Sequence, residues 1–266
     1  MAAPRIRVGI GGWVYEPWRG NFYPSGWPQQ RELEYASQRL SAIEINGTYY
    51  STPTRTSVAK WRDSTPEDFI FSVKASRFAT NRRVLAEAGE SVARFIGSGI
   101  TELGPKLGPI VWQFAPTKRF DPVDFEAFLK LLPTQADGLA LRHVLDVRHD
   151  SFRSPEYLAL ARRHGVATVL TESDEYPALF DAQAGLVYAR IMRTEAALPE
   201  GITPQTLDQL AACAQLLQAG GLPTGMPLLE AAQDATTAPR EVFVFFISGA
   251  KERAPAAAMA LMRRLD

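Results

Sequence analysis

Polar side chains stand at or near the ends of short apolar runs that are typical of β-strands. Glu44 and Asn46 lie two residues apart in the run AIEINGTYY, so that they share one face of a strand. A carboxylate inside such an apolar strand is costly unless it is paired or functional. Other runs carry similar groups near their ends, namely Lys74, Gln113, Asp146, Arg148, Glu172 and Arg190. Cations gathered with amide groups predict a site for a small anion, because the arginine fork matches phosphate and carboxylate groups.

Specific roles follow from the residue types. Glu44 and Asp146 are the candidate catalytic residues, because a well-placed carboxylate can accept a proton from a substrate. The candidate ligand-binding residues are Trp13, Asn46, Tyr49, Lys74, Gln113, Arg148, His149 and Arg190. A structural ion pair explains any one of these charges equally well. The whole set favours a site that binds a small anionic or polyhydroxylated (sugar-like) ligand, and an enzyme that transforms this ligand without a metal is one hypothesis for it.

Two other functions stay open. Glu44, Asp146, His149 and Glu172 offer oxygen and imidazole ligands for a metal-dependent hydrolase or isomerase. However, the sequence has no HExxH motif, no paired cysteines and only three histidines, and three cations nearby would repel a metal. No GxGxxG, P-loop or GxSxG motif is present. We therefore expect no metal and no cofactor.

The second alternative is a non-catalytic protein that binds a metabolite or single-stranded nucleic acid. Aromatic residues are dense in and just before the irregular stretch Val14–Gln30, namely Trp13, Tyr15, Trp18, Phe22, Tyr23 and Trp27. They predict either a hydrophobic plug or a stacking surface for a base or sugar ring. Lys+Arg and Asp+Glu both number 29, a balance that does not favour a dedicated nucleic-acid binder.

Short apolar runs alternate with helical patterns along the 266 residues. The expected strands are Arg5–Gly9, Ser41–Ile45, Ile70–Val73, Pro109–Gln113, His143–Val147, Ala167–Leu170, Leu186–Ile191 and Val242–Phe246. The expected helices are Arg31–Leu40, Thr56–Arg62, Glu87–Gly104, Phe125–Leu132, Pro155–His164, Pro204–Ala219 and Ala254–Leu265. This alternation predicts a parallel sheet, and eight units in this length favour one closed (β/α)8 TIM-like barrel over a doubly wound sheet. We expect a single domain over residues 1–266, with irregular segments at Val14–Gln30 and Gly220–Pro239.

Composition bounds the setting of the protein. The single cysteine, Cys213, excludes an internal disulfide and favours a reducing compartment. The N-terminal residues lack a signal-peptide core, and no apolar run is long enough for a membrane span. We expect a cytoplasmic protein without a membrane partner. The sequence gives no signal for an oligomeric state.

Several segments together resemble the YecE-like barrel family, known as domain of unknown function 72. They are GIGGWVYEPWRGNFYP, EINGTYYSTP, FIFSVK, LGPIVWQFAP, LDVRHDSF, YARIMR and FVFFISGAKERAPAAAMAL, in family order. The resemblance covers about Ile6 to Leu265 and implies a TIM-like barrel without an assigned reaction. It places the characteristic polar residues of the family at Glu44, Asn46, Lys74, Gln113, Arg148, His149 and Arg190.

The sequence departs from the family pattern at a few positions. Asn81 and Met192 stand where the family usually has histidines, and Ile247 and Ser248 stand where it has asparagines. Asp146 and Phe152 replace a glutamate and a tryptophan. The missing imidazoles remove groups for acid–base chemistry or metal binding, which favours a binding role over the family's unknown chemistry.

Overall fold

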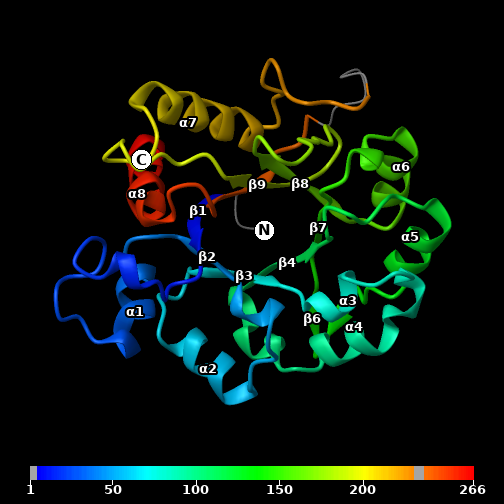
Figure 1. The fold of residues 1–266 in the computed structure, drawn as a ribbon, viewed down its shortest axis with the longest axis horizontal. Helices are drawn as coiled ribbons and strands as arrows, with labels where there is room; N and C mark the ends of the chain where they lie inside the picture. Colours follow the sequence, from blue (N-terminus) through cyan, green and yellow to red (C-terminus); the bar gives the residue numbers. More distant parts are fainter. Residues whose placement is uncertain (1–4, 231–236) are drawn as a thin grey trace.

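Eight parallel strands close into a barrel in the computed structural model, which describes residues 5–230 and 237–266 (Figure 1). The strands are β1 (Ile6–Gly11), β2 (Ala42–Ile45), β3 (Ile70–Lys74), β4 (Leu107–Gln113), β7 (His143–Asp146), β8 (Ala167–Glu172), β9 (Leu186–Ile191) and β10 (Glu241–Phe246). Each strand pairs with its neighbour in the chain order, and β10 pairs with β1 to close the ring. This architecture confirms the predicted (β/α)8 barrel.

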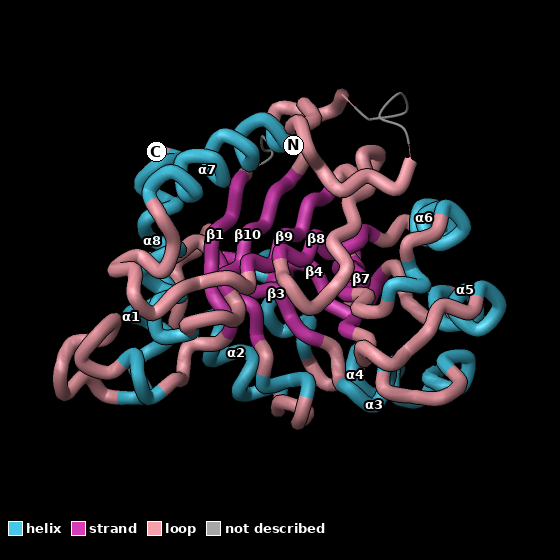
Figure 2. The backbone as a smooth tube through the Cα atoms, turned by 45° about the horizontal axis from the view of Figure 1, so that its top comes forward, coloured by secondary structure: helices cyan, strands magenta, loops and turns pink. Residues whose placement is uncertain are grey.

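Helices surround the barrel on its outside (Figure 2). They are α1 (Glu32–Ser37), α2 (Arg55–Asp63), α3 (Arg77–Thr80), α4 (Gly89–Ile96), α5 (Pro122–Leu129), α6 (Pro155–Arg163), α7 (Pro204–Gln218) and α8 (Ala254–Leu265). A two-residue hairpin, β5 (Gln135–Ala136) with β6 (Leu139–Ala140), precedes β7. Residues 173–185 connect β8 to β9 without a helix. Part of the predicted irregular segment Gly220–Pro239, residues 231–236, lies outside the described residues.

The predicted helix Glu87–Gly104 is wrong as a single element. Helix α4 ends at Ile96, and a 3-10 segment, Ile100–Lys106, follows it. Gly99 and Gly104 have φ angles of 97° and 56°, in the left-handed region that glycine adopts without a steric penalty. The glycines thus break the helical pattern that the apolar spacing had suggested.

The interior of the barrel has an apolar floor beneath a polar layer. Side chains alternate faces with a period of two along a strand, so that Ala42 and Glu44 both point inward from β2. The floor is a cluster of buried residues that includes Ala42, Val111, Val144 and Phe243. One step further along three of these strands, the inward positions carry Glu44, Gln113 and Asp146. The C-terminal halves of the strands therefore place polar groups above a dry core.

The loop after β1 forms a hydrophobic plug. Trp18 and Tyr23 are buried, and both pack against Phe22, which in turn contacts Tyr35 of α1. The Trp18 indole N–H donates to the Lys251 carbonyl oxygen at 2.9 Å. This bond ties the loop after β1 to the segment after β10, on the side of the barrel where the polar layer lies.

Candidate functional site

An arginine at the centre of the polar layer binds two buried carboxylates. Arg190 of β9 contacts Glu44 Oε1 through Nη2 at 2.6 Å and Asp146 Oδ2 through Nη1 at 2.5 Å. The side chains of Glu44 and Asp146 are fully buried, and that of Arg190 is only 1% exposed. Burial opposes the charge of Arg190, but the two carboxylates outweigh it and raise the pKa of the guanidinium. Arg190 is therefore the cationic partner that both carboxylates share inside the barrel.

Tyr188 donates a hydrogen bond to the Glu44 carboxylate. Its hydroxyl donates to Glu44 Oε2 at 2.6 Å and lies 2.7 Å from the Ser72 hydroxyl. Burial raises the pKa of Tyr188 well above its usual value, and the neighbouring Glu44 carboxylate raises it further. Tyr188 therefore keeps its proton and remains a donor, which fixes the orientation of the carboxylate.

A second arginine extends the cluster toward the strand ends. Arg148 Nη2 donates to Asp146 Oδ2 at 3.0 Å and to Gln113 Oε1 at 2.8 Å. Gln113 Oε1 also accepts from Arg190 Nη1 at 3.1 Å, so that one amide oxygen bridges both arginines. The Arg148 guanidinium stacks over the Tyr176 ring at 4.3 Å from its centroid. These contacts leave the outer side of Arg148 facing the mouth of the barrel.

Lys74 differs from the arginines because no carboxylate in the described part of the chain pairs with it. Lys74 is 8% exposed, and its ammonium makes no ion pair or side-chain hydrogen bond among the described residues. The ammonium lies 4.2 Å from the centroid of the Tyr49 ring. Burial and then the charge of Arg190 lower the pKa of Lys74 to about 8, although Glu44 and Asp146 oppose this shift.

A cavity of about 710 Å³ opens above this layer at the C-terminal ends of the strands. Its lining includes five of the predicted residues, Asn46, Lys74, Gln113, Arg148 and Arg190, together with Tyr176, Arg193 and Lys251. Glu44 and Asp146 lie behind the arginines and do not line the cavity. The cationic and amide groups thus face the space that a ligand would occupy, Glu44 and Asp146 face the cations, and Asp174 and Glu175 line the cavity as well.

The family is shown by comparison with known proteins. The model of the family described as "Protein of unknown function DUF72" matches residues 7–266. The chain is a member of the DUF72 family. The UPF0759 protein YecE of Escherichia coli strain K12 is 26% identical over 176 residues, which cover 63% of this chain and 59% of YecE.

Solved structures of DUF72 proteins share the fold. A DUF72 family protein from Thermotoga maritima superimposes with a TM-score of 0.71 at 22% identity, covering 98% of both chains. One from Enterococcus faecalis gives a TM-score of 0.67 at 18% identity, again covering 98% of both chains. At these identities the likeness establishes the barrel of this DUF72 protein and leaves its ligand to be argued from its own residues.

Three further predicted residues lie outside the main cavity. Trp13 lines a smaller cavity beside it. Tyr49 lies beneath Lys74, and its hydroxyl accepts a hydrogen bond from Asn81 Nδ2 at 3.1 Å. His149 caps the short 3-10 helix Asp150–Phe152, where its Nδ1 accepts from the Ser151 amide at 3.1 Å. Tyr49 therefore contacts the site through Lys74, whereas His149 has a local capping role.

Several residues of the site escaped the sequence reasoning. Tyr176, Arg193 and Lys251 all line the cavity, but they follow the strand ends by two or more residues in the loops after β8, β9 and β10. Tyr188 lies inside strand β9, where the sequence pattern predicts that an aromatic residue packs in the hydrophobic core. A search of the loops that follow each strand would have found the first three.

Two structural findings bear on the alternative functions of this DUF72 protein. Within residues 5–230 and 237–266, no group of three or more His, Cys, Asp and Glu side chains is placed to hold a metal ion. Oxygens of Glu44 and Asp146, proposed as metal ligands, accept instead from Arg190, and His149 caps a helix. Every described helix is too short or too polar to cross a lipid bilayer. The cytoplasmic location stays a prediction.

Proposed function

We propose that this DUF72 protein binds a small anionic or polyhydroxylated ligand in the cavity at the C-terminal ends of the barrel strands. The observation that carries the proposal is Lys74, an ammonium in the cavity wall that has no carboxylate partner within residues 5–230 and 237–266. A buried cation normally has a counter-charge, because leaving water costs it hydration. A bound anion would supply the missing counter-charge.

The charges around the cavity support an anion rather than a cation. Arg148 and Arg190 balance Asp146 and Glu44, so Lys74 leaves one positive charge over in the inner layer. At the rim, Arg193 pairs with Glu172 at 3.1 Å and with Asp174 at 2.9 Å. Glu175 and Lys251 add one further charge of each sign to the lining. The inner end of the cavity is therefore the positive end.

Amide groups would orient such a ligand. Asn46 and Gln113 both line the cavity, and the one hydrogen bond of the Asn46 side chain to a described residue is a long contact of 3.5 Å to the Glu44 carbonyl oxygen. Its carbonyl oxygen and amide protons are available for hydroxyl or phosphoryl groups. Arg148 donates to Asp146 through Nε and Nη2 and to Gln113 through Nη2, which orients the guanidinium and leaves its Nη1 N–H groups to donate to an oxyanion.

The candidate catalytic residues take a positioning role in this proposal. Glu44 and Asp146 hold Arg190 and Arg148 in place, and each is separated from the cavity by the guanidinium that it binds. Any proton transfer by either carboxylate to a ligand first requires that an arginine move aside. We therefore assign them to ligand orientation, with general-base action as a hypothesis that Glu44→Gln tests.

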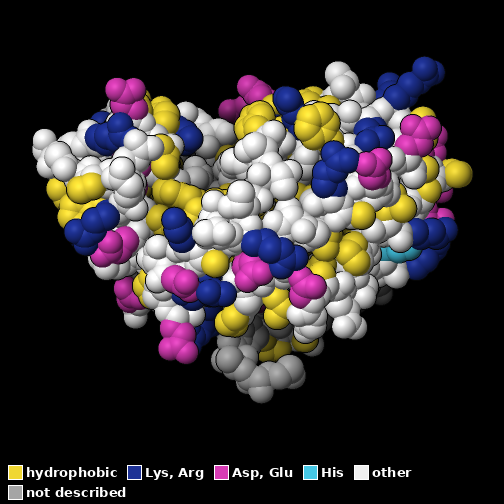
Figure 3. Space-filling view, turned by 90° about the horizontal axis from the view of Figure 1, so that it is seen from below, with side chains coloured by type: hydrophobic (Ala, Val, Ile, Leu, Met, Phe, Trp, Pro, Cys, Tyr) yellow, Lys and Arg dark blue, Asp and Glu magenta, His cyan; other side chains and the backbone are white. Residues whose placement is uncertain are grey.

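The nucleic-acid alternative has less support. Lysine and arginine side chains alternate with aspartate and glutamate over the face seen in Figure 3 and form no continuous basic stripe there. Trp18, Phe22 and Tyr23, three members of the aromatic loop, are buried in the plug. Binding along a phosphate backbone usually needs a basic groove with accessible aromatic rings.

Calorimetric titration with sulfate near pH 7 tests the proposal, because sulfate keeps its charge across the range in which Lys74 titrates. We expect binding to the unaltered protein and at least about a tenfold loss of affinity in Lys74→Met, since a buried charge-assisted contact contributes roughly 1.5–3 kcal/mol. Lys60→Met, which removes an exposed lysine of α2, is the matched control.

A neutral polyol, myo-inositol, distinguishes the two ligand classes. Binding of inositol that persists in Lys74→Met, without binding of sulfate, would assign the cavity to polyhydroxylated ligands. If neither probe binds, or if Lys74→Met binds sulfate as tightly as the unaltered protein, the proposal is wrong.

A further inference from the structure

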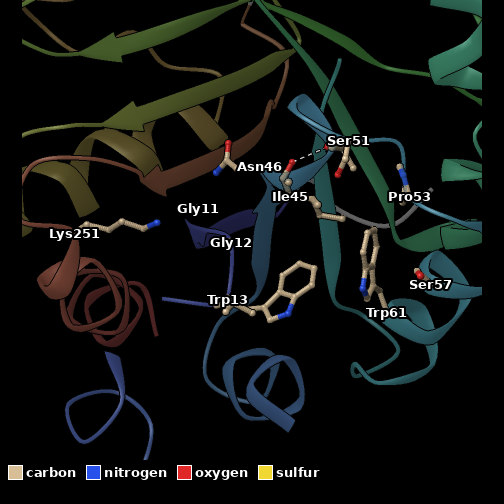
Figure 4. A pocket seen from close by; sticks show the side chains of 13 residues that line it. Gly11, Gly12, Trp13, Ile45, Asn46, Ser51, Pro53, Ser57, Trp61 and Lys251 are labelled. Carbon is tan, nitrogen blue, oxygen red and sulfur yellow. Dashed lines mark hydrogen bonds between the residues drawn. The ribbon is translucent and has the colours of Figure 1, made fainter. Parts of the chain in front are cut away.

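A second cavity adjoins the first one at the mouth of the barrel. It has a volume of about 350 Å³ and lies between the loop after β1, the turn after β2 and helix α2 (Figure 4). Gly11, Asn46 and Lys251 line both cavities, so that the two spaces meet at these residues. The positively charged inner end of the first cavity is therefore continuous with the second cavity.

Two tryptophans form the far wall of this second cavity. The rings of Trp13 and Trp61 lie 5.4 Å apart between centroids, at an interplanar angle of 72°. The Tyr23 hydroxyl donates to the Trp13 carbonyl oxygen at 2.6 Å, which fixes the backbone that carries this ring. Phe71 packs against the other side of Trp13 at 6.4 Å. Trp13 is thus packed between Trp61 and Phe71 and has its backbone carbonyl oxygen hydrogen-bonded.

The indole groups of this wall retain polar capacity. Neither the Trp13 nor the Trp61 indole N–H donates a hydrogen bond to an acceptor among the described residues. Both residues are only partly buried, and both line the cavity. A tryptophan in an ordinary core position usually has its N–H paired, so partly exposed indoles with unpaired N–H groups in the wall of a cavity are typical of a recognition surface.

The junction between the two cavities is polar and open. Asn46 and Lys251 extend into it, and Lys251 points toward Gly11 and Gly12 in Figure 4. A Cβ atom on Gly11 would lie 2.7 Å from Asn46 Nδ2, so glycine is what lets the Asn46 amide reach this position. The Lys251 ammonium has no carboxylate partner among the described residues, and burial lowers its pKa.

We infer that the second cavity binds an aromatic ring of the same ligand whose anionic group binds beside Lys74. The ligand class is then a small anion that carries one planar ring, such as an aryl or arylalkyl phosphate. This inference rests on the proposed function for the anionic half and adds the ring half. Aromatic groups pack favourably against indole rings, and both rings of the tryptophan pair line this cavity.

The position of the second cavity supports one ligand rather than two. Asn46 and Lys251 lie between the anion end and the tryptophan wall, so that a single molecule that spans both spaces contacts all of these groups. The second cavity alone is at the lower end of the range of about 300–1,000 Å³ that holds small ligands. It is therefore large enough for one aromatic ring and for the chain that links the ring to the anionic group.

The test compares three phosphate monoesters of similar charge on the unaltered protein by calorimetry, namely methyl, phenyl and 2-phenylethyl phosphate. Their anionic groups are alike, so any difference in affinity reports the ring and its reach. We expect the better of the two aromatic esters to bind about tenfold more tightly than methyl phosphate, from ring burial plus edge-to-face contact. This comparison needs no variant and does not depend on the folding of one.

Variants then locate the ring. Trp61→Leu is expected to remove the advantage of the aromatic esters and to leave the affinity for methyl phosphate unchanged. Trp27→Leu is the matched control, because Trp27 packs on Tyr35 in the plug and lines neither cavity. An advantage that disappears in Trp61→Leu and persists in Trp27→Leu supports the inference.

The two proposals fail in different ways. If all three esters bind equally, the ring subsite is wrong and the anion site stands. An aromatic advantage that survives in Trp61→Leu also overturns the ring subsite. If none of the esters binds, the proposed anion site and the ring subsite both fall.

Discussion

Replacement of Arg190 by methionine tests whether the polar layer is held by its central arginine. Methionine is unbranched, apolar and adaptable, so it fills most of the space without a charge. The change removes the contacts of 2.6 Å to Glu44 and 2.5 Å to Asp146. Asp146 keeps its contact with Arg148, but Glu44 is left as a fully buried carboxylate with only Tyr188 as a side-chain donor among the described residues.

The expected loss of stability follows from that stranded charge. Removal of one partner from a buried ion pair costs about 3–5 kcal/mol, because the remaining charge has neither water nor a counter-ion. Adding Glu44→Gln to the variant replaces the charge by a neutral amide that can still accept from Tyr188. The double variant should therefore recover part of the lost free energy of unfolding, although each single change is destabilising.

Equilibrium urea unfolding near pH 7, followed by circular dichroism, measures these differences. Arg264→Met is the matched control, because it removes an arginine whose partner Asp208 is 67% exposed, and it should cost less than about 1 kcal/mol. If Arg190→Met unfolds at the same urea concentration as Arg264→Met, the cluster does not hold the barrel interior. The stranded-charge argument is also refuted if the double variant loses as much free energy of unfolding as the two single variants lose together.

Three further predictions concern single groups of the site. Because the pKa of Lys74 is about 8, sulfate affinity measured by calorimetry should be fully present below that pH and fall about tenfold between pH 7 and pH 9, whereas Lys74→Met should show no such fall. Tyr188→Phe removes the 2.6 Å donor to Glu44 and should lower the free energy of unfolding in urea by roughly 1–3 kcal/mol; an unchanged midpoint would show that Glu44 does not depend on that hydroxyl. Gly11→Ala brings a Cβ to 2.7 Å from Asn46 Nδ2, so it should lower the free energy of unfolding by about 1–3 kcal/mol and weaken sulfate binding. A variant that binds sulfate and unfolds in urea as the unaltered protein does would contradict the placement of Asn46.

Much of the barrel could be predicted from the sequence, because parallel strands buried on both faces appear as short apolar runs. The inward face of each strand also follows from a period of two. Glu44 and Asp146 share that face with Ala42 and Val144 of the floor, which is why polar groups far apart in the chain meet above a dry core.

Which groups pair with each other could not be predicted. Ion pairing depends on the strand order around the barrel and on side-chain reach, and Arg190 lies beside Glu44 only because the ring closes. Lys251 and Tyr176 come from loops whose paths no periodic pattern describes. His149 adopts a capping role that depends on the backbone of Asp150–Phe152.

The anion site is tested most directly by a crystal structure of the protein soaked in selenate, which mimics sulfate and gives an anomalous signal. We predict an anomalous peak in the 710 Å³ cavity, within hydrogen-bond distance of Lys74 Nζ or the Arg148 guanidinium, and loss of that peak in Lys74→Met. Selenate bound at other surfaces with none in the cavity would contradict the account.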